Sequence, residues 1–299
     1  MNVQTSGIAD RMREQFPEVI KARLSGPDGM PTPHYGLFNM TTGAGFGPAV
    51  KEQFVPHSTE DVIALCEAAE AAFGEAAEVD CGFNGGHHVV IQPSKQERLN
   101  VFDGGNDSCW PRLLIRGVYG ECFRATVGYY RDACRNLAIM RQVSGTSVVI
   151  RHTSGLRSQM DDLIATFGSL QGGWTALSAR LRQMEQMRVG LAAFLDRVYP
   201  LADDASEATV TRHRNRTEVI VRRIMQERVA TGRTSEDLTP VSLIDRQTVS
   251  AFEAYNAVQG YAQHTKTRKG RVAAFDRAIL AFSDPIVAAA ERAAFEMAV

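Results

Sequence analysis

The residues best suited to catalysis lie in Arg131-Asp132-Ala133-Cys134-Arg135-Asn136 and, further along, in Arg151-His152-Thr153. A cysteine beside a histidine can act as a thiolate nucleophile. Nothing in the sequence places Cys134 and His152 in contact, and only Asn136 is at hand to orient them. A buried, unreactive cysteine at a strand end is the simpler interpretation.

A metal site is not indicated either. His87 and His88 are adjacent, so in a strand they point to opposite faces and cannot share one ion. No ligand spacing connects them to Cys81 or Cys109. We expect structural histidines and buried thiols, and no metal.

Two further patterns are too weak to indicate an active site. The run Gly43-Ala44-Gly45-Phe46-Gly47 lacks the Lys-Ser end of a phosphate loop and precedes a strand, so it predicts a hairpin turn. Carboxylates such as Asp161-Asp162 and Glu67/Glu70 are scattered, whereas a two-metal nuclease needs them clustered. The sequence therefore predicts no catalytic residue and no cofactor.

Arginines and one tyrosine on the predicted strands are more informative. Arg112 and Arg116 share a face of one strand, and Arg124 shares a face of the next with Tyr130. Such a face suits single-stranded DNA, because arginines contact phosphates while aromatic rings stack on bases, for about 1–3 kcal/mol per base. The alternative is a solvated outer sheet face with ion pairs.

Basic residues elsewhere complete the predicted interface. Arg151 is expected at a helix start, where the helix dipole favours an anion. Lys266, Arg268, Lys269 and Arg271 are expected in an exposed loop, because Gly270 and two threonines disfavour helix. The predicted DNA-binding residues are Arg112, Arg116, Arg124, Tyr130, Arg131, Arg135, Arg151, Lys266, Arg268, Lys269 and Arg271. A further run, with arginines at 212, 214, 216, 222, 223 and 228, is most simply a solvated helix face.

Composition is that of an ordinary globular protein, with 299 residues, 44% apolar and 22% charged. The net charge is −1, but residues 1–150 carry 13 basic and 17 acidic side chains (−4), while residues 151–299 carry 20 and 17 (+3). Five cysteines without a CxxC pair suggest reduced thiols. No apolar run approaches the ~20 residues that span a bilayer, and the first residues lack a signal core, so we expect a cytoplasmic protein.

The elements that would position these residues follow from hydrophobic spacing. Helices are expected over residues 8–24, from 58 or 59 to 77, from 153 to 198 with a kink at Gly172-Gly173, and over 206–230, 244–264, 270–282 and 285–297. Strands are expected over residues 35–40, 49–55, 87–92, 98–102, 111–119, 122–130 and 148–152, separated by glycine turns.

This order predicts an α+β fold, with a hairpin, a helix, antiparallel strands and a long helix, followed by a helical C-terminal region. We expect a core domain over residues 1–198 and the helical region over 199–299. The order is similar to the core of phage single-strand annealing proteins of the RecT and Red beta type.

Two motifs also resemble a phage- and plasmid-borne family known as domain of unknown function 932. That family pairs an arginine-cysteine-asparagine strand end with an arginine-histidine-threonine helix start, as in residues 131–136 and 151–153. It later has an asparagine-alanine helix that ends in a histidine, as in Asn256-Ala257 and His264. The resemblance covers roughly residues 30–295 and implies a mobile-element lineage, but no activity.

Together these observations predict a non-enzymatic phage or plasmid protein in the bacterial cytoplasm, which binds single-stranded DNA and promotes strand annealing in recombination. The implied partners are single-stranded DNA, further copies of the chain in a ring or filament, and a phage exonuclease or host single-strand binding protein. The alternatives are a structural or interaction protein of the mobile element and an unrecognised hydrolase or nuclease.

Overall fold

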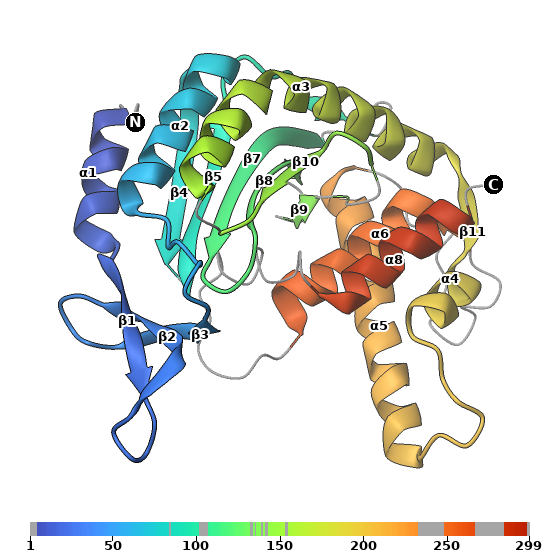
Figure 1. The fold of residues 1–299 in the computed structure, drawn as a ribbon. Coiled ribbons are helices and arrows are strands. Elements are labelled where there is room, and N and C mark those ends of the chain that lie inside the picture. Colours follow the sequence, from blue (N-terminus) through green and yellow to red (C-terminus); the bar gives the residue numbers. More distant parts are fainter. Residues whose placement is uncertain are drawn as a thin grey trace. The chain divides into compact units, whose positions relative to one another are not determined.

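The computed structural model describes residues 5–83, 85–101, 107–131, 134, 136–138, 140, 143–152, 155–232, 248–266 and 284–297. Antiparallel strands follow one another in runs, β1 to β3 and β4 to β10, and helices lie before, between and after these runs (Figure 1). The C-terminal part is mainly helical. The predicted α+β class is confirmed.

The chain forms two compact units, each built from several segments. The first comprises residues 1–97, 111–127 and 145–174, and the second comprises residues 98–110, 128–144 and 175–299. This division differs from the expected boundary after residue 198, because residues 175–198 belong with the C-terminal helices.

Two helices and a small sheet open the first unit. Helix α1 (Thr5–Gln15) precedes a three-stranded antiparallel sheet of β1 (Val19–Ser25), β2 (Pro31–Asn39) and β3 (Gly45–Val50), and helix α2 (Thr59–Phe73) follows. Helix α2 buries the predicted stripe from Val62 to Phe73, and Ser58 and Asp61 form a capping box at its start.

The larger sheet has the order β10-β8-β7-β5-β4, with β6 beside β7 and β9 beside β8. Its strands are β4 (Ala76–Phe83), β5 (Gly86–Pro93), β6 (Leu99–Asn100), β7 (Ser108–Val118), β8 (Phe123–Arg131), β9 (Asn136–Ala138) and β10 (Ser147–Ile150). Strands β7 and β8 have residues in both units. Strands β5, β7, β8 and β10 lie where the sequence predicted them.

The expected helix over residues 8–24 is wrong beyond Gln15. Pro17 has no backbone N–H and restricts Phe16 to an extended conformation, which ends the helix. Val19 and Ile20 then begin β1, which pairs along β2. Strand β4 was not predicted, since its sequence AAEVDCGF alternates weakly and becomes a strand by pairing with β5.

Helix α3 (Leu156–Gln186) starts later than expected and runs through Gly172-Gly173 without a break. Gly173 instead serves a close approach, because a Cβ there would lie 2.3 Å from the carbonyl oxygen of Gly145. Within the first unit, Phe73 of α2 contacts Phe167 and Trp174 of α3.

The second unit contains the end of α3 and the C-terminal helices. They are α4 (Leu191–Val198), α5 (Glu207–Ala230), α6 (Ala251–Gly260), the π-helix η2 (Tyr261–Thr265) and α8 (Pro285–Glu296). Strands β11 (Arg188–Gly190) and β12 (Thr248–Ser250) pair beside them. Every residue of α6 is buried. The helix expected over residues 270–282 lies outside the described residues.

The two glycines of α3 give a matched test. Gly173→Ala should destabilise the protein, because the new methyl group meets backbone that cannot move freely. Gly172→Ala meets no atom within 4 Å, so it should stabilise the helix by about 0.5–1 kcal/mol. Urea unfolding of both variants measures the difference, and equal effects would show that the approach at Gly173 is unimportant.

Candidate functional site

A group of polar side chains extends from the interior of the second unit to its surface, where His264 is exposed. We call it the polar centre, and it consists of Asp107, Arg131, Cys134, Asn136, Glu227, Asn256 and His264. Asp107 precedes β7, Arg131 ends β8, Cys134 lies between β8 and β9, and Asn136 begins β9. Helix α5 supplies Glu227, α6 supplies Asn256, and η2 supplies His264.

Arg131 is the charged core of this group, with a side chain only 2% exposed. Its Nε donates to Asp107 Oδ2 and its Nη1 donates to Glu227 Oε2, both at 2.6 Å. Two carboxylates therefore share one guanidinium in a place that excludes water. Burial raises the pKa of Glu227 although Arg131 opposes the rise.

A directional hydrogen-bond chain runs from the asparagines into this ion pair. Asn136 Nδ2 donates to Asn256 Oδ1 at 2.9 Å, and Asn256 Nδ2 donates to Glu227 Oε2 at 2.6 Å. Since Asn136 Oδ1 can only accept, His264 Nε2, 3.1 Å away, must carry the proton of that contact. The amide orientations and the histidine tautomer are thus fixed by one another.

Cys134 lies against this chain, 3.5 Å from Asn256 Nδ2 and 3.7 Å from Arg131 Nη1. Burial and the charge of Glu227 raise the pKa of its thiol to about 11. The thiol is therefore protonated at neutral pH, unlike a nucleophilic cysteine. His152, the histidine that would have to activate Cys134, belongs to the first unit and contacts the Val55 carbonyl there.

Sequence reasoning missed the acidic half of the polar centre, Asp107 and Glu227. One signal was available in residues 251–263, where Glu253, Asn256, Gln259 and Gln263 recur at helical spacing among small and apolar residues. All four are buried. Such a stripe on an otherwise apolar helix indicates a polar interior, and a π-helix at its end is frequent at functional sites.

A family model described as "Domain of unknown function (DUF932)" matches residues 119–281. The chain belongs to the DUF932 family. The match includes Arg131, Cys134, Asn136, Asn256 and His264, residues distant in sequence that meet in the polar centre. No curated protein and no solved structure matches the chain, so the similarity to RecT-type topology is not confirmed.

The sheet arginines of this DUF932 protein are not the free cations that we expected. Arg112 donates to Glu78 at 2.8 Å and to Gln92, and its side chain is 10% exposed. Arg116 forms a two-pronged pair with Glu121 at 2.6 and 3.2 Å. Neighbouring carboxylates therefore neutralise them, as in the ion-paired alternative.

The other predicted DNA-binding residues vary in setting. Arg131 is enclosed in the polar centre, whereas Arg124 and Tyr130 are half-buried. Arg151 is exposed but precedes α3 by several residues, and its backbone N–H donates to Gln159 Oε1. The expected first helical residue, Thr153 or Ser154, lies outside the described residues. Lys266 pairs with Asp284 at 2.6 Å. Residues 135, 268, 269 and 271 lie outside the described part of the chain.

Helix α5 carries six arginines, of which Arg228 is buried and pairs with Glu253, while the other five are more accessible. Arg212, Arg214 and Arg222 are exposed, and Arg216 and Arg223 are half-buried. None of the five forms an ion pair with a carboxylate that the structure describes. Figure 1 shows the first turns of α5 extending past α6 and α8. A basic surface therefore exists in the second unit, on a helix rather than on the sheet.

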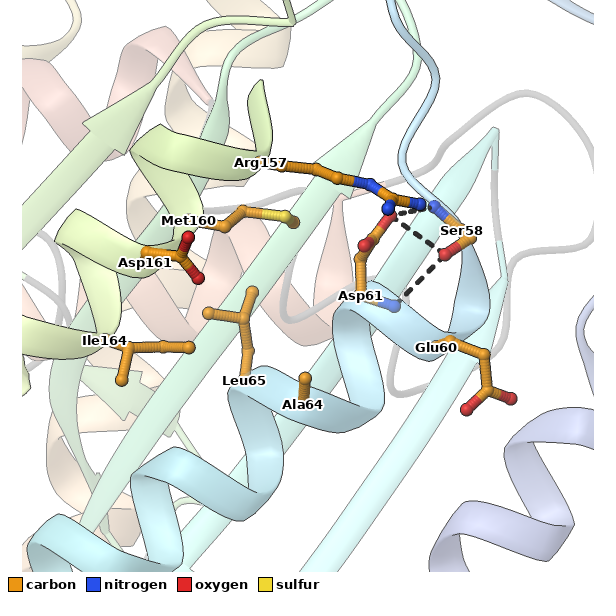
Figure 2. Close-up of a pocket in the computed structure, with 9 residues that line it drawn as sticks. All are labelled: Ser58, Glu60, Asp61, Ala64, Leu65, Arg157, Met160, Asp161 and Ile164. Atoms are coloured by element: carbon orange, nitrogen blue, oxygen red, sulfur yellow. Dashed lines mark hydrogen bonds between the residues drawn. The ribbon is translucent and has the colours of Figure 1, made fainter. Parts of the chain in front are cut away.

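A groove of about 290 Å³ lies between α2 and α3 in the first unit (Figure 2). Leu65, Met160 and Ile164 give it apolar walls. Two of its carboxylates serve local structure, because Asp61 Oδ2 accepts from the Ser58 backbone N–H in the capping box of α2 and Glu60 pairs with Arg13. Among the described residues, no three potential metal ligands lie close enough together to hold an ion. None of the described helices is long and apolar enough to cross a membrane.

Three histidines form a second buried cluster, in the first unit. His57 Nε2 and His87 Nδ1 share a hydrogen bond of 2.8 Å, and the His57 ring stacks on Tyr119. His152 stacks on Phe54. Burial lowers the pKa of all three, with neighbouring histidines adding to the effect for His57 and His87, and His87 reaches about 3.

The polar centre predicts a large cost for removing its guanidinium. Arg131→Met leaves two buried carboxylates without a cation, so unfolding free energy should fall by about 3–5 kcal/mol. Arg116→Met is the control, because its partner Glu121 is 53% exposed and such a pair contributes about 1 kcal/mol or less. Urea unfolding measures both. An Arg131→Met protein as stable as the control would show that the pair is not needed for stability.

The histidine cluster predicts acid sensitivity. Unfolded imidazoles take up protons below about pH 6.5, while the buried ones do not, so stability must fall as pH drops from 6.5 toward the folded pKa values. Three such groups give a slope of up to about 4 kcal/mol per pH unit. His87→Gln should reduce the slope between pH 6.5 and 5 by about one third, and a flat wild-type profile there would contradict the assignment.

Proposed function

We propose that this DUF932 protein binds single-stranded DNA and promotes annealing of complementary strands, as an oligomer and without catalysing a reaction. The observation that carries the proposal is that five arginines of α5 form no ion pair with a described carboxylate, three of which, Arg212, Arg216 and Arg223, share one side of the helix. Arginines that no carboxylate neutralises retain their full attraction for phosphates. The proposed interface therefore moves from the sheet to this helix.

Annealing requires a surface that holds the backbone and leaves the base edges open. Side chains on one exposed helix suit this task, because phosphate contacts position a strand without reading its sequence. The net charge of −1 does not oppose it, since the cations are concentrated locally and repeated copies in a ring or filament would join them into one groove. The resemblance to mobile-element proteins and the order of elements agree with this role.

The rival functions receive less support. A hydrolase or nuclease that uses Cys134 would need a thiolate, and the buried thiol holds its proton at neutral pH. An interaction protein of the mobile element would leave the α5 arginines solvated. Salt dependence separates these possibilities, because counterion release makes phosphate-driven affinity fall steeply with salt.

The α5 arginines give the direct test. Replacing Arg212, Arg214 and Arg222 with glutamine should make the slope of log affinity against log salt shallower by about 2, since each single-strand phosphate contact contributes about 0.7. Fluorescence anisotropy with a labelled oligo-dT measures the slope.

The matched control replaces Arg157, Arg182 and Arg292, which are also exposed and form no ion pair with a described carboxylate. It removes the same charge from other elements and should change the slope much less. Equal slopes for both triple variants would remove α5 from the interface. Absence of wild-type binding at micromolar protein in about 50 mM salt would refute DNA binding itself.

A further inference from the structure

Two of the five α5 arginines that form no described ion pair differ from the other three, because other elements of the second unit hold their guanidinium groups in place. Arg216 and Arg223 are half-buried, whereas Arg212, Arg214 and Arg222 are exposed. We infer that Arg216 and Arg223 form two preformed phosphate-binding forks on the same face of α5. This inference rests on the proposed function and specifies how the backbone of a single strand is held.

Tyr199 supports the first fork. The guanidinium carbon of Arg216 lies 4.3 Å from the centroid of the Tyr199 ring, and Tyr199 is only 5% exposed. His213, one turn earlier on α5, contacts the Tyr199 carbonyl at 3.0 Å and fixes the same junction. Arg216 makes no hydrogen bond to any described residue, so its planar array of donors is held by stacking while remaining available to an anion.

Gly260 makes room for the second fork. A Cβ at this position would lie 2.7 Å from both Nε and Nη2 of Arg223, so the guanidinium rests directly on the backbone of α6. Gly260 has ordinary helical angles, φ −61° and ψ −37°. The glycine is therefore not required by the backbone conformation, and its lack of a side chain serves the approach of Arg223.

The donors of Arg223 are poorly satisfied within the protein. Its Nη1 contacts Thr265 Oγ1 at a long 3.4 Å, and its buried Nε has no acceptor among the described residues. Because Nε and Nη2 face the backbone of Gly260, a phosphate oxygen would bind at the outer edge of the guanidinium, where Nη1 has only this one weak contact. Glu227, one turn along α5, could compete with a phosphate for the Arg223 guanidinium, because its Oε1 has no donor among the described residues.

The spacing suits two phosphates of one strand. Arg216 and Arg223 are seven residues apart, which places them on the same side of the helix and about 10.5 Å apart along its axis. The guanidinium fork matches two phosphate oxygens, whereas an ammonium group offers only a point charge. Replacing arginine with lysine therefore removes the fork and keeps the charge.

The test compares two charge-conserving double variants in the full chain. Arg216→Lys with Arg223→Lys should weaken oligo-dT binding by about tenfold or more, with an unchanged salt slope, because fork contacts are lost at constant charge. Arg214→Lys with Arg222→Lys, the matched control, should bind like wild type. Equal affinities for the two double variants overturn the inference and leave the proposed function standing.

Gly260→Ala provides a second test that leaves every arginine in place. The new methyl group must displace Arg223, so oligo-dT affinity should fall while the melting temperature stays equal or rises, as alanine favours helix. Gly168→Ala, at a helical glycine with open space around it, is the control. If Arg223→Lys lowers the melting temperature and leaves affinity unchanged, Arg223 serves Glu227 and the inference falls.

Inorganic tripolyphosphate separates the forks from DNA binding as a whole. If wild type binds no DNA but is stabilised against heating by tripolyphosphate, and the Arg216/Arg223 lysine variant is not, the forks stand while the proposed function fails. If tripolyphosphate stabilises both proteins equally, the two arginines are not forks. Inorganic phosphate at the same ionic strength distinguishes a site for linked phosphates from one for any free anion.

Discussion

A single buried guanidinium organises the second unit. Arg131, enclosed between Asp107 and Glu227, cannot be solvated, so both carboxylates must stay within hydrogen-bonding distance of it. This requirement ties the end of β8 to the residue before β7 and to the last turns of α5. The asparagine chain extends the same constraint to β9, α6 and η2. Arg131, Cys134, Asn136, Asn256 and His264, which carry two of the three motifs that resemble the DUF932 family, thus meet around one polar interior.

Such an interior specifies an arrangement as much as it stabilises one. In this hydrogen-bond chain each asparagine amide donates only through Nδ2 and accepts only through Oδ1, so each partner must offer the matching acceptor or donor. A small shift of α6 along its axis would leave Glu227 or Asn136 without its partner. The complete burial of α6 makes such mismatches costly, which explains how polar residues at helical spacing can occupy a helix with no exposed face.

The arginines of this protein illustrate how setting determines what a cation can do. In the sheet, Arg112 pairs with Glu78 and Arg116 pairs with Glu121, so both charges are neutralised within the fold. On α5, five arginines form no ion pair with a described carboxylate, although Glu227 lies one turn from Arg223, so these side chains keep most of their charge for a partner. The half-buried pair, Arg216 and Arg223, combines this availability with a fixed position.

Local patterns in the sequence determined the α+β class, the buried stripe and cap of α2, most strands of the larger sheet, and the family. These follow from the alternation of strands, from helical periodicity and from residue types at fixed spacing, all of which act over a few residues. Pro17, correctly weighted, would also have separated α1 from β1. The weak alternation of β4 gave no comparable signal, because that strand depends on its partner β5.

Only the tertiary structure decided which charges are neutralised and which glycines serve close approaches. Arg131 meets Glu227 across almost a hundred residues, and Gly173 and Gly260 are defined by the atoms opposite them. No spacing along the chain encodes such meetings, because burial and long-range pairing depend on how whole elements pack. The proposed site therefore moved from the predicted sheet face to α5, where five arginines form no ion pair with a described carboxylate.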